Sequence, residues 1–187
     1  MIELHRSFTS PYVRHCRVAL ADRGIDDRFV EIDYAASAAA SPTQRLPFLL
    51  GAGQPVTDSS SILRWVREEG GGRFLADLDA FDRDLMVNTA LDTTVNLFLL
   101  ERDGLEPDRV PYLAPQRDRV VSSLEVLERR FDGVDGTEDD GLRLACYLSW
   151  AAFRKRIDAS PYPTLRRSVA HRDDDPVFAD THPTRGG

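Results

Sequence analysis

The sequence has few of the residues that build disulfide or metal scaffolds. Its only two cysteines, Cys16 and Cys146, lie far apart and have no Cys-x-x-Cys spacing. Two thiols cannot complete a structural zinc site, and a structural disulfide is uncommon in a reducing compartment. The four histidines are scattered without the spacing of metal ligands, so we expect no metal site. We predict that both cysteines are buried core residues, because free cysteine packs as a small apolar side chain.

Long apolar runs and an excess of positive charge are also missing. No uncharged apolar stretch approaches the roughly 20 residues that cross a bilayer, and Glu3 and Arg6 stand where a signal peptide would be apolar. There are 31 acidic residues against 24 basic ones, for a formal net charge of -7. Nucleic-acid binding needs a basic face that neutralises phosphates. These features predict a soluble cytoplasmic protein that binds neither membranes nor nucleic acids.

The composition is otherwise that of a globular protein. Hydrophobic residues make up 42% and charged residues 29% of the 187 residues. A chain of this length can bury a substantial core, as one large domain or two small ones.

The first part of the chain alternates strand and helix signals. Residues 2–4 begin a short strand, and Ser10 and Pro11 stand at the preferred N-cap and first position of a helix that stops at Gly24. Residues 28–33 alternate polar and apolar side chains, as a half-buried strand does. This order predicts a β-α-β unit, which is strongly right-handed.

A second set of signals follows within the same region. Residues 35–41 predict a short helix, residues 46–50 a strand that begins at a proline, and residues 54–57 its returning hairpin partner. Asp58 or Thr57 can cap a helix over residues 59–69, which a run of three glycines ends.

Strand signals disappear from Leu75 onward. Amphipathic patterns predict long helices over residues 82–103 and 111–131. A third helix is expected to begin at a capping sequence in residues 137–140 and to run to about residue 154, and residues 162–171 can form a shorter one. The sequence therefore predicts an α/β domain over residues 1–74 and an all-helical domain over residues 80–187.

Three places in the first domain carry residue types that suit ligand binding. Ser10 lies at a helix N-terminus, where the helix dipole favours negative charge and a hydroxyl can donate to a thiolate. A proline such as Pro47 fits the start of an inner strand when its peptide bond is cis or when no N–H is needed there; a cis bond would leave the Leu46 backbone available to an extended ligand. Asp58 and Ser59 open the next helix, where they can hold an ammonium and a carboxylate. Taken singly, each feature is more often an ordinary cap or turn.

Together, these segments resemble the cytosolic glutathione transferases of the bacterial, serine-type kind. The carrying motifs are Thr-Ser-Pro-Tyr-Val-Arg at residues 9–14, Arg-Leu-Pro-Phe-Leu at residues 45–49 and Thr-Asp-Ser-Ser-Ser-Ile-Leu at residues 57–63. The resemblance covers essentially the whole chain. It implies a thioredoxin-like N-terminal domain, an all-α C-terminal domain and a homodimer.

The resemblance also implies a role for each motif. Ser10 would activate the sulfur of glutathione, although the neighbouring Thr9 hydroxyl is an alternative. Leu46 would pair its backbone with the cysteinyl unit beside a cis-Pro47, and Arg45 would lie near the glycyl carboxylate. Asp58 and Ser59 would hold the γ-glutamyl end.

One loop departs from the family pattern. The family usually has Asn-Pro-x-Gly-Lys-Val-Pro, whereas this chain has Ser-Pro-Thr-Gln-Arg-Leu-Pro at residues 41–47. Ser41 and Gln44 thus replace Asn and Gly, which predicts an altered loop near the glycyl end of glutathione.

Three functions follow from the resemblance. The first is an enzyme that transfers the glutathione thiolate to a small electrophile and serves detoxification, with glutathione as co-substrate and no metal. The second is a glutathione-binding or regulatory module with little catalysis. The third is a glutathione-dependent isomerase or reductase, of which the reductase is disfavoured because the cap residue is Ser10 and not a cysteine.

Overall fold

A computed structural model describes residues 1–185, apart from the side chain of Tyr34. The chain divides into two compact units, one formed by Met1–Phe74 with the chain from Arg172 onward and the other by Leu75–His171. Residues 172–185, which the sequence pattern assigned to the helical domain, therefore lie in the first unit. Gly186 and Gly187, the end of the predicted 80–187 domain, lie outside the described residues.

The first unit contains a mixed sheet in the order β2-β1-β3. The central strand β1 (Ile2–Arg6) runs parallel to β2 (Asp27–Glu31) and antiparallel to β3 (Phe48–Leu50). Parallel neighbours need a long crossover connection, and helix α1 (Pro11–Asp22) supplies it. The predicted β-α-β unit is confirmed.

The expected hairpin after β3 is reduced to one bridge. Val56 exchanges two backbone hydrogen bonds with Leu49, of 2.8 and 3.0 Å, and no strand forms over residues 54–57. Pro55 has no amide hydrogen to donate, and Asp58 already caps the next helix. The strand predicted to begin at residue 46 likewise begins two residues later, at Phe48.

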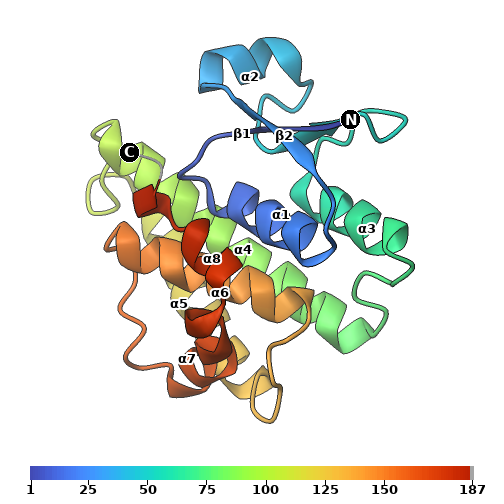
Figure 1. Cartoon of the computed structure of the whole chain (residues 1–187). Helices are drawn as coiled ribbons and strands as arrows, with labels where there is room; N and C mark the ends of the chain where they lie inside the picture. Colours follow the sequence, from blue (N-terminus) through green and yellow to red (C-terminus); the bar gives the residue numbers. More distant parts are fainter. Residues whose placement is uncertain (186–187) are drawn as a thin grey trace. The chain divides into compact units, whose positions relative to one another are not determined.

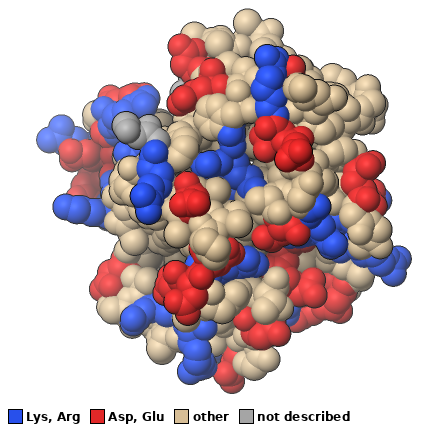
Figure 2. Space-filling view, viewed as in Figure 1, with Lys and Arg blue, Asp and Glu red and all other residues tan. Residues whose placement is uncertain are grey.

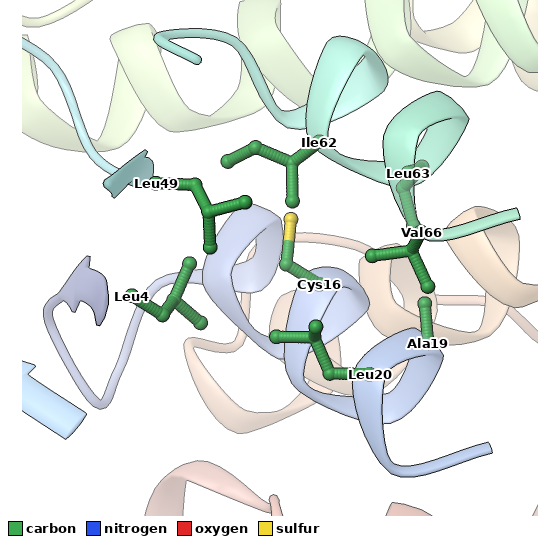
Figure 3. Packing of buried hydrophobic residues seen from close by; sticks show 8 residues of the cluster. All are labelled: Leu4, Cys16, Ala19, Leu20, Leu49, Ile62, Leu63 and Val66. Atoms are coloured by element: carbon green, nitrogen blue, oxygen red, sulfur yellow. The ribbon is translucent and has the colours of Figure 1, made fainter. Parts of the chain in front are cut away.

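Helices cover both faces of this sheet. Figure 1 shows α2 (Tyr34–Ala40) on one side of the strands, and α1 and α3 (Ser59–Glu69) on the other. The buried cluster between the sheet and the latter two helices is shown in Figure 3; it consists of Leu4, Cys16, Ala19, Leu20, Leu49, Ile62, Leu63 and Val66. The predicted burial of Cys16 is confirmed.

The last described residues return to α1. A 3-10 helix (Ala170–Asp174) precedes α8 (Pro176–Asp180), which packs against α1, and a second 3-10 helix (Pro183–Arg185) follows. Asp175 caps α8 by accepting from two backbone N–H groups. Phe178 is buried.

The second unit is all-helical in its described residues, as predicted. It contains α4 (Leu78–Arg102), α5 (Leu113–Arg130), α6 (Asp139–Phe153) and α7 (Pro163–Val169). Helix α4 begins four residues before the predicted start because the Asp77 carboxylate accepts from the Ala80 N–H at 2.9 Å.

The predicted cap of α6 is wrong in its detail. The hydroxyl of Thr137 donates to Asp135 at 2.8 Å and does not cap the helix. The N-cap residue is Glu138, whose side chain makes no capping hydrogen bond. Cys146 is buried on this helix, as predicted.

Basic and acidic side chains are interspersed over the face seen in Figure 2. Among the described residues, no helix combines the length and the apolar character that crossing a membrane requires.

Candidate functional site

The register of the sheet brings the Leu46–Pro47 segment to the end of the sheet where α1 begins. Strand β3 runs antiparallel to β1, with Phe48 opposite His5. The residues that precede Phe48 therefore extend past the carboxyl end of β1, and the chain leaves that same end to reach Ser10.

The same register places the start of α3 at this end. Val56 pairs antiparallel with Leu49, so the chain after Val56 runs in the direction of β1. Asp58 and Ser59 follow within three residues. The three motifs predicted from the sequence thus lie at the same end of the sheet, the carboxyl end of β1.

Ser10 is the N-cap of α1, as predicted. Its hydroxyl oxygen accepts from the Val13 N–H at 3.4 Å, and its carbonyl accepts from the Arg14 N–H at 3.1 Å. The residue is partly exposed. Because the capping bond uses a lone pair of the hydroxyl, the hydroxyl proton is available to a negatively charged group at the helix N-terminus.

The Leu46–Pro47 peptide bond is cis, as predicted. Pro47 is buried, whereas Leu46 is partly exposed. Within residues 1–185, neither the N–H nor the carbonyl of Leu46 has a hydrogen-bond partner. An extended ligand strand can therefore pair with this backbone, which is the second predicted feature of the site.

The loop before Leu46 keeps a left-handed residue although it lacks glycine. Gln44 has a φ of 53°, and its N–H donates to the Ser41 carbonyl at 2.9 Å. The hydroxyls of Ser41 and Thr43 are also hydrogen-bonded to each other, at 2.9 Å. The sequence change at Gln44 thus falls at a position whose backbone favours glycine. Arg45 is exposed on this loop.

Asp58 and Ser59 offer two different groups at the start of α3. One carboxylate oxygen of Asp58, Oδ1, accepts from the N–H groups of Ser60 at 2.8 Å and Ser61 at 3.4 Å. In the described part of the chain, its other oxygen has no partner, and neither has the Ser59 hydroxyl. Asp58 is exposed, whereas Ser59 is buried to 6% exposure. The pair therefore presents a carboxylate oxygen and a hydroxyl to a ligand.

A direct contact joins α1 to the start of α3. The Cys16 thiol donates to the Ser59 carbonyl at 3.8 Å, and the Cys16 side chain lies wholly inside the apolar cluster. Cys16 therefore contacts the start of α3 from inside the core and is not exposed at the candidate site.

One buried charge beside the candidate site was not predicted from the sequence: the side chain of Arg14 on α1 is 2% exposed. The signal that could have found it is its position four residues after the N-cap Ser10. Across the described residues, no group of three or more histidine, cysteine, aspartate or glutamate side chains is placed to hold a metal ion.

Comparison with known proteins bears on this site. Residues 4–74 match the family model described as "Glutathione S-transferase, N-terminal domain". A probable maleylacetoacetate isomerase of Caenorhabditis elegans is 26% identical, over 89% of this chain and 86% of that protein.

Solved structures resemble the chain over nearly its whole length. A glutathione S-transferase of Methylobacillus flagellatus, with glutathione bound, is 22% identical and has a TM-score of 0.85, covering 98% of this chain and 100% of that chain. A maleylacetoacetate isomerase of Methylobacterium extorquens, with malonate and glutathione bound, is 25% identical with a TM-score of 0.73, covering 98% and 97%. These findings show the glutathione S-transferase fold, with its thioredoxin-like first part and helical second part, and they support that family.

Proposed function

We propose that the protein is a glutathione-dependent enzyme that transfers the thiolate of glutathione to an electrophilic small molecule. The observation that carries this proposal is the extent of the likeness to a relative with glutathione bound, at a TM-score of 0.85 over 98% of this chain. The family match over residues 4–74 lies on the unit that holds the three motifs.

Ser10 is the residue we assign to the sulfur, as in serine-type transferases. Its cap geometry leaves a hydroxyl proton that can donate to the thiolate, and the N-terminus of α1 favours that negative charge. Thr9 makes no capping bond to α1 among the described residues, which favours Ser10 over it.

The backbone of glutathione is assigned to the other two motifs. Leu46, beside Pro47, pairs its N–H and carbonyl with the cysteinyl unit, and Arg45 binds the glycyl carboxylate. Asp58 meets the γ-glutamyl ammonium through its second oxygen, and Ser59 holds the γ-glutamyl carboxylate. These assignments use groups that have no other partner at Leu46, Asp58 and Ser59 within residues 1–185.

The reaction then makes modest demands on the protein. The bound thiol loses its proton to solvent, and the sulfur forms a bond to the electrophilic carbon while a leaving group departs with the bonding electrons. The rate comes from holding thiolate and electrophile together and from the lowered pKa of the bound thiol.

A second candidate is glutathione-dependent isomerisation, which the maleylacetoacetate isomerase relatives favour. There the thiolate adds to a conjugated carbon–carbon double bond, the resulting single bond rotates, and elimination returns the thiolate. Glutathione is consumed in transfer but not in isomerisation. Measuring free thiol during turnover of a maleyl ketone and of chlorodinitrobenzene therefore separates the two reactions.

We also propose how the chain divides into domains, how it assembles and where it acts. We assign the glutathione site to a domain of residues 1–74, and we limit the predicted helical domain of residues 80–187 to its part up to His171, since the chain from Arg172 onward belongs to the first unit. We assign the active form to a cytoplasmic homodimer that acts in detoxification. The family match over residues 4–74 supports this assignment. Analytical ultracentrifugation of the purified protein tests the dimer, and a monomer would contradict it.

Calorimetric titration with glutathione tests the site directly. We expect binding in the micromolar to millimolar range, weakened by Ser59→Ala through the loss of one ligand hydrogen bond. Ser10→Ala is expected to retain binding but to raise the pKa of the bound thiol and to slow conjugation. No heat of binding at millimolar glutathione would overturn the proposed function.

A further inference from the structure

The buried guanidinium of Arg14 joins the first turn of α1 to the C-terminal segment. The Nη2 of Arg14 donates to the Phe178 carbonyl at 2.7 Å, and its Nε donates to the Thr181 hydroxyl oxygen at 3.2 Å. Its guanidinium carbon lies 3.6 Å from the centre of the Phe178 ring. Phe178 and Thr181, which follow Arg14 by 164 and 167 positions in the sequence, are thereby held against the helix.

The segment that binds Arg14 is itself held in shape by hydrogen bonds and an ion pair between residues close in sequence. Asp175 accepts from the N–H groups of Val177 at 2.9 Å and Phe178 at 3.2 Å, and Arg172 pairs with Asp175 at 3.1 Å. The Thr181 hydroxyl also donates to the Phe178 carbonyl, at 3.0 Å. This segment, residues 175–181, therefore presents a fixed carbonyl and a fixed hydroxyl to Arg14.

The same residue holds Ser10 through its main chain. The Arg14 N–H donates to the Ser10 carbonyl at 3.1 Å, which closes the first turn of α1 beside the capping bond from the Val13 N–H. A buried guanidinium cannot shift without losing its hydrogen bonds, which is costly away from water. The position of Ser10 is thus tied to the C-terminal segment through one residue.

We propose that Arg14 is a positioning residue for Ser10, and that segment 175–181 is in this way a working part of the glutathione-binding unit. The inference rests on the proposed function, because it assigns the precise placement of Ser10 to a contact outside residues 1–74. Arg14 is buried, and its guanidinium is bound to segment 175–181. A hydroxyl stabilises a thiolate only within hydrogen-bonding distance, so a small displacement of α1 weakens that bond.

The test compares graded variants in the full-length protein. Arg14→Met removes the cation, Arg14→Lys keeps the charge but loses the forked geometry, and Thr181→Val removes one acceptor with little change of shape. Arg28→Gln is the matched control, since it removes an exposed arginine that pairs with Glu3 on the sheet. Ultraviolet absorbance of the bound thiolate against pH gives the acid dissociation constant of the thiol, and calorimetry gives the Kd of glutathione.

We expect the acid dissociation constant of the bound thiol to fall about tenfold or more in Arg14→Met, and by less in Arg14→Lys and Thr181→Val. The Kd of glutathione should change less than about threefold, because Leu46, Asp58 and Ser59 are untouched. The Arg28→Gln control should match the wild type in both quantities.

The outcomes separate this inference from the proposed function. If glutathione binding leaves the wild-type thiol unchanged, the proposed function is overturned. If Ser10→Ala has no effect on the bound thiol, the assignment of Ser10 is overturned, and the positioning role of Arg14 with it. If the wild type lowers the thiol pKa through Ser10 but folded Arg14→Lys and Thr181→Val do so equally well, only the positioning role is overturned. An equal loss of affinity and of thiol ionisation would also overturn it, since that marks a general structural defect. Should Arg14→Met fail to fold, the two milder variants still decide.

Discussion

The candidate site in the first unit and the interior of the second unit use polar side chains in different ways. In the first unit, Ser10 and Asp58 lie at helix ends near the surface, where one part of each side chain caps a helix and another part is left for a ligand. In the second unit, charged side chains lie inside and bind one another. Arg143 and Asp84 are 1% and 0% exposed and form a pair of 2.6 Å.

A second buried pair repeats this arrangement. Arg83 donates to Asp140 at 2.7 Å, and both side chains are buried. Arg143 also donates to Asn88 at 2.7 Å. The difference between these two regions teaches that a buried charge paired with an opposite charge serves stability, whereas a capping side chain at a helix end keeps an atom for a ligand.

The largest expected effect comes from breaking the Asp84–Arg143 pair. Either Asp84→Leu or Arg143→Met leaves an uncompensated buried charge, and we expect each to lower the free energy of unfolding by about 3–5 kcal/mol. The double variant should recover most of this loss, because two apolar side chains replace both charges. Urea unfolding of the wild type, the two single variants and the double variant measures these free energies. A double variant whose loss equals the sum of the two single losses would contradict the prediction.

The buried pair also predicts a pH dependence. Burial raises the pKa of Asp84 above its ordinary value despite the attraction of Arg143, and Asp139 and Asp140 act in the same direction. The folded state therefore holds this proton more tightly than the unfolded state, so the contribution of Asp84 to stability is greatest at low pH and is lost as the pH rises through the folded pKa. Comparing unfolding of the wild type with the double Leu/Met variant across acidic to neutral pH isolates this contribution.

Cys16 gives a smaller effect in the first unit. Cys16→Ala removes a sulfur from the buried cluster and its contact with Ser59, and we expect a loss of about 1–2 kcal/mol in unfolding free energy. Glutathione affinity should stay near the wild-type value, since Cys16 supports the site without reaching it. A large loss of affinity in a folded Cys16→Ala protein would show that the residue takes part in binding. Cys146→Ala is the matched control in the second unit.

Substitutions of Asp58 can separate its capping of α3 from its proposed binding of glutathione. Asp58→Ala loses both cap bonds and should lower stability by about 1 kcal/mol. Asp58→Asn retains a capping oxygen, so its stability should stay close to that of the wild type while its glutathione affinity falls at least tenfold through the lost charge. Thermal unfolding and calorimetry on both variants check this, and unchanged affinity in Asp58→Asn would remove Asp58 from the site.

The smallest effect is expected at Gln44. A left-handed residue other than glycine is strained, so Gln44→Gly should relieve up to about 1 kcal/mol, offset in part by the greater freedom of the unfolded chain. Urea unfolding of Gln44→Gly and Gln44→Ala gives the sign of the difference between their free energies of unfolding. If Gln44→Gly is less stable than Gln44→Ala, the greater freedom of the unfolded chain outweighs the relief of strain, which contradicts the prediction.

Much of the local structure at the candidate site could be predicted from the sequence because its signals are local. A serine before a proline caps a helix, and an aspartate before the pattern of residues 59–69 caps another, whatever surrounds them. The alternation of strand and helix in residues 2–33 likewise predicts the β-α-β unit, since parallel neighbours require a crossover. The failures lie where local signals compete: Asp77 started α4 early, and the predicted strand over residues 54–57 yielded to Pro55 and to the cap at Asp58.

The sequence by itself determined the helix caps, the β-α-β order, the change to helices after residue 75 and the three motifs of the candidate site. Only the tertiary structure decided that the C-terminal segment returns to α1, that Arg14 is buried against Phe178, and that Asp84 faces Arg143 across 59 residues of chain. Local signals act over a few residues, whereas these contacts join distant ones. They form because a buried charge must find partners wherever the folded chain provides them.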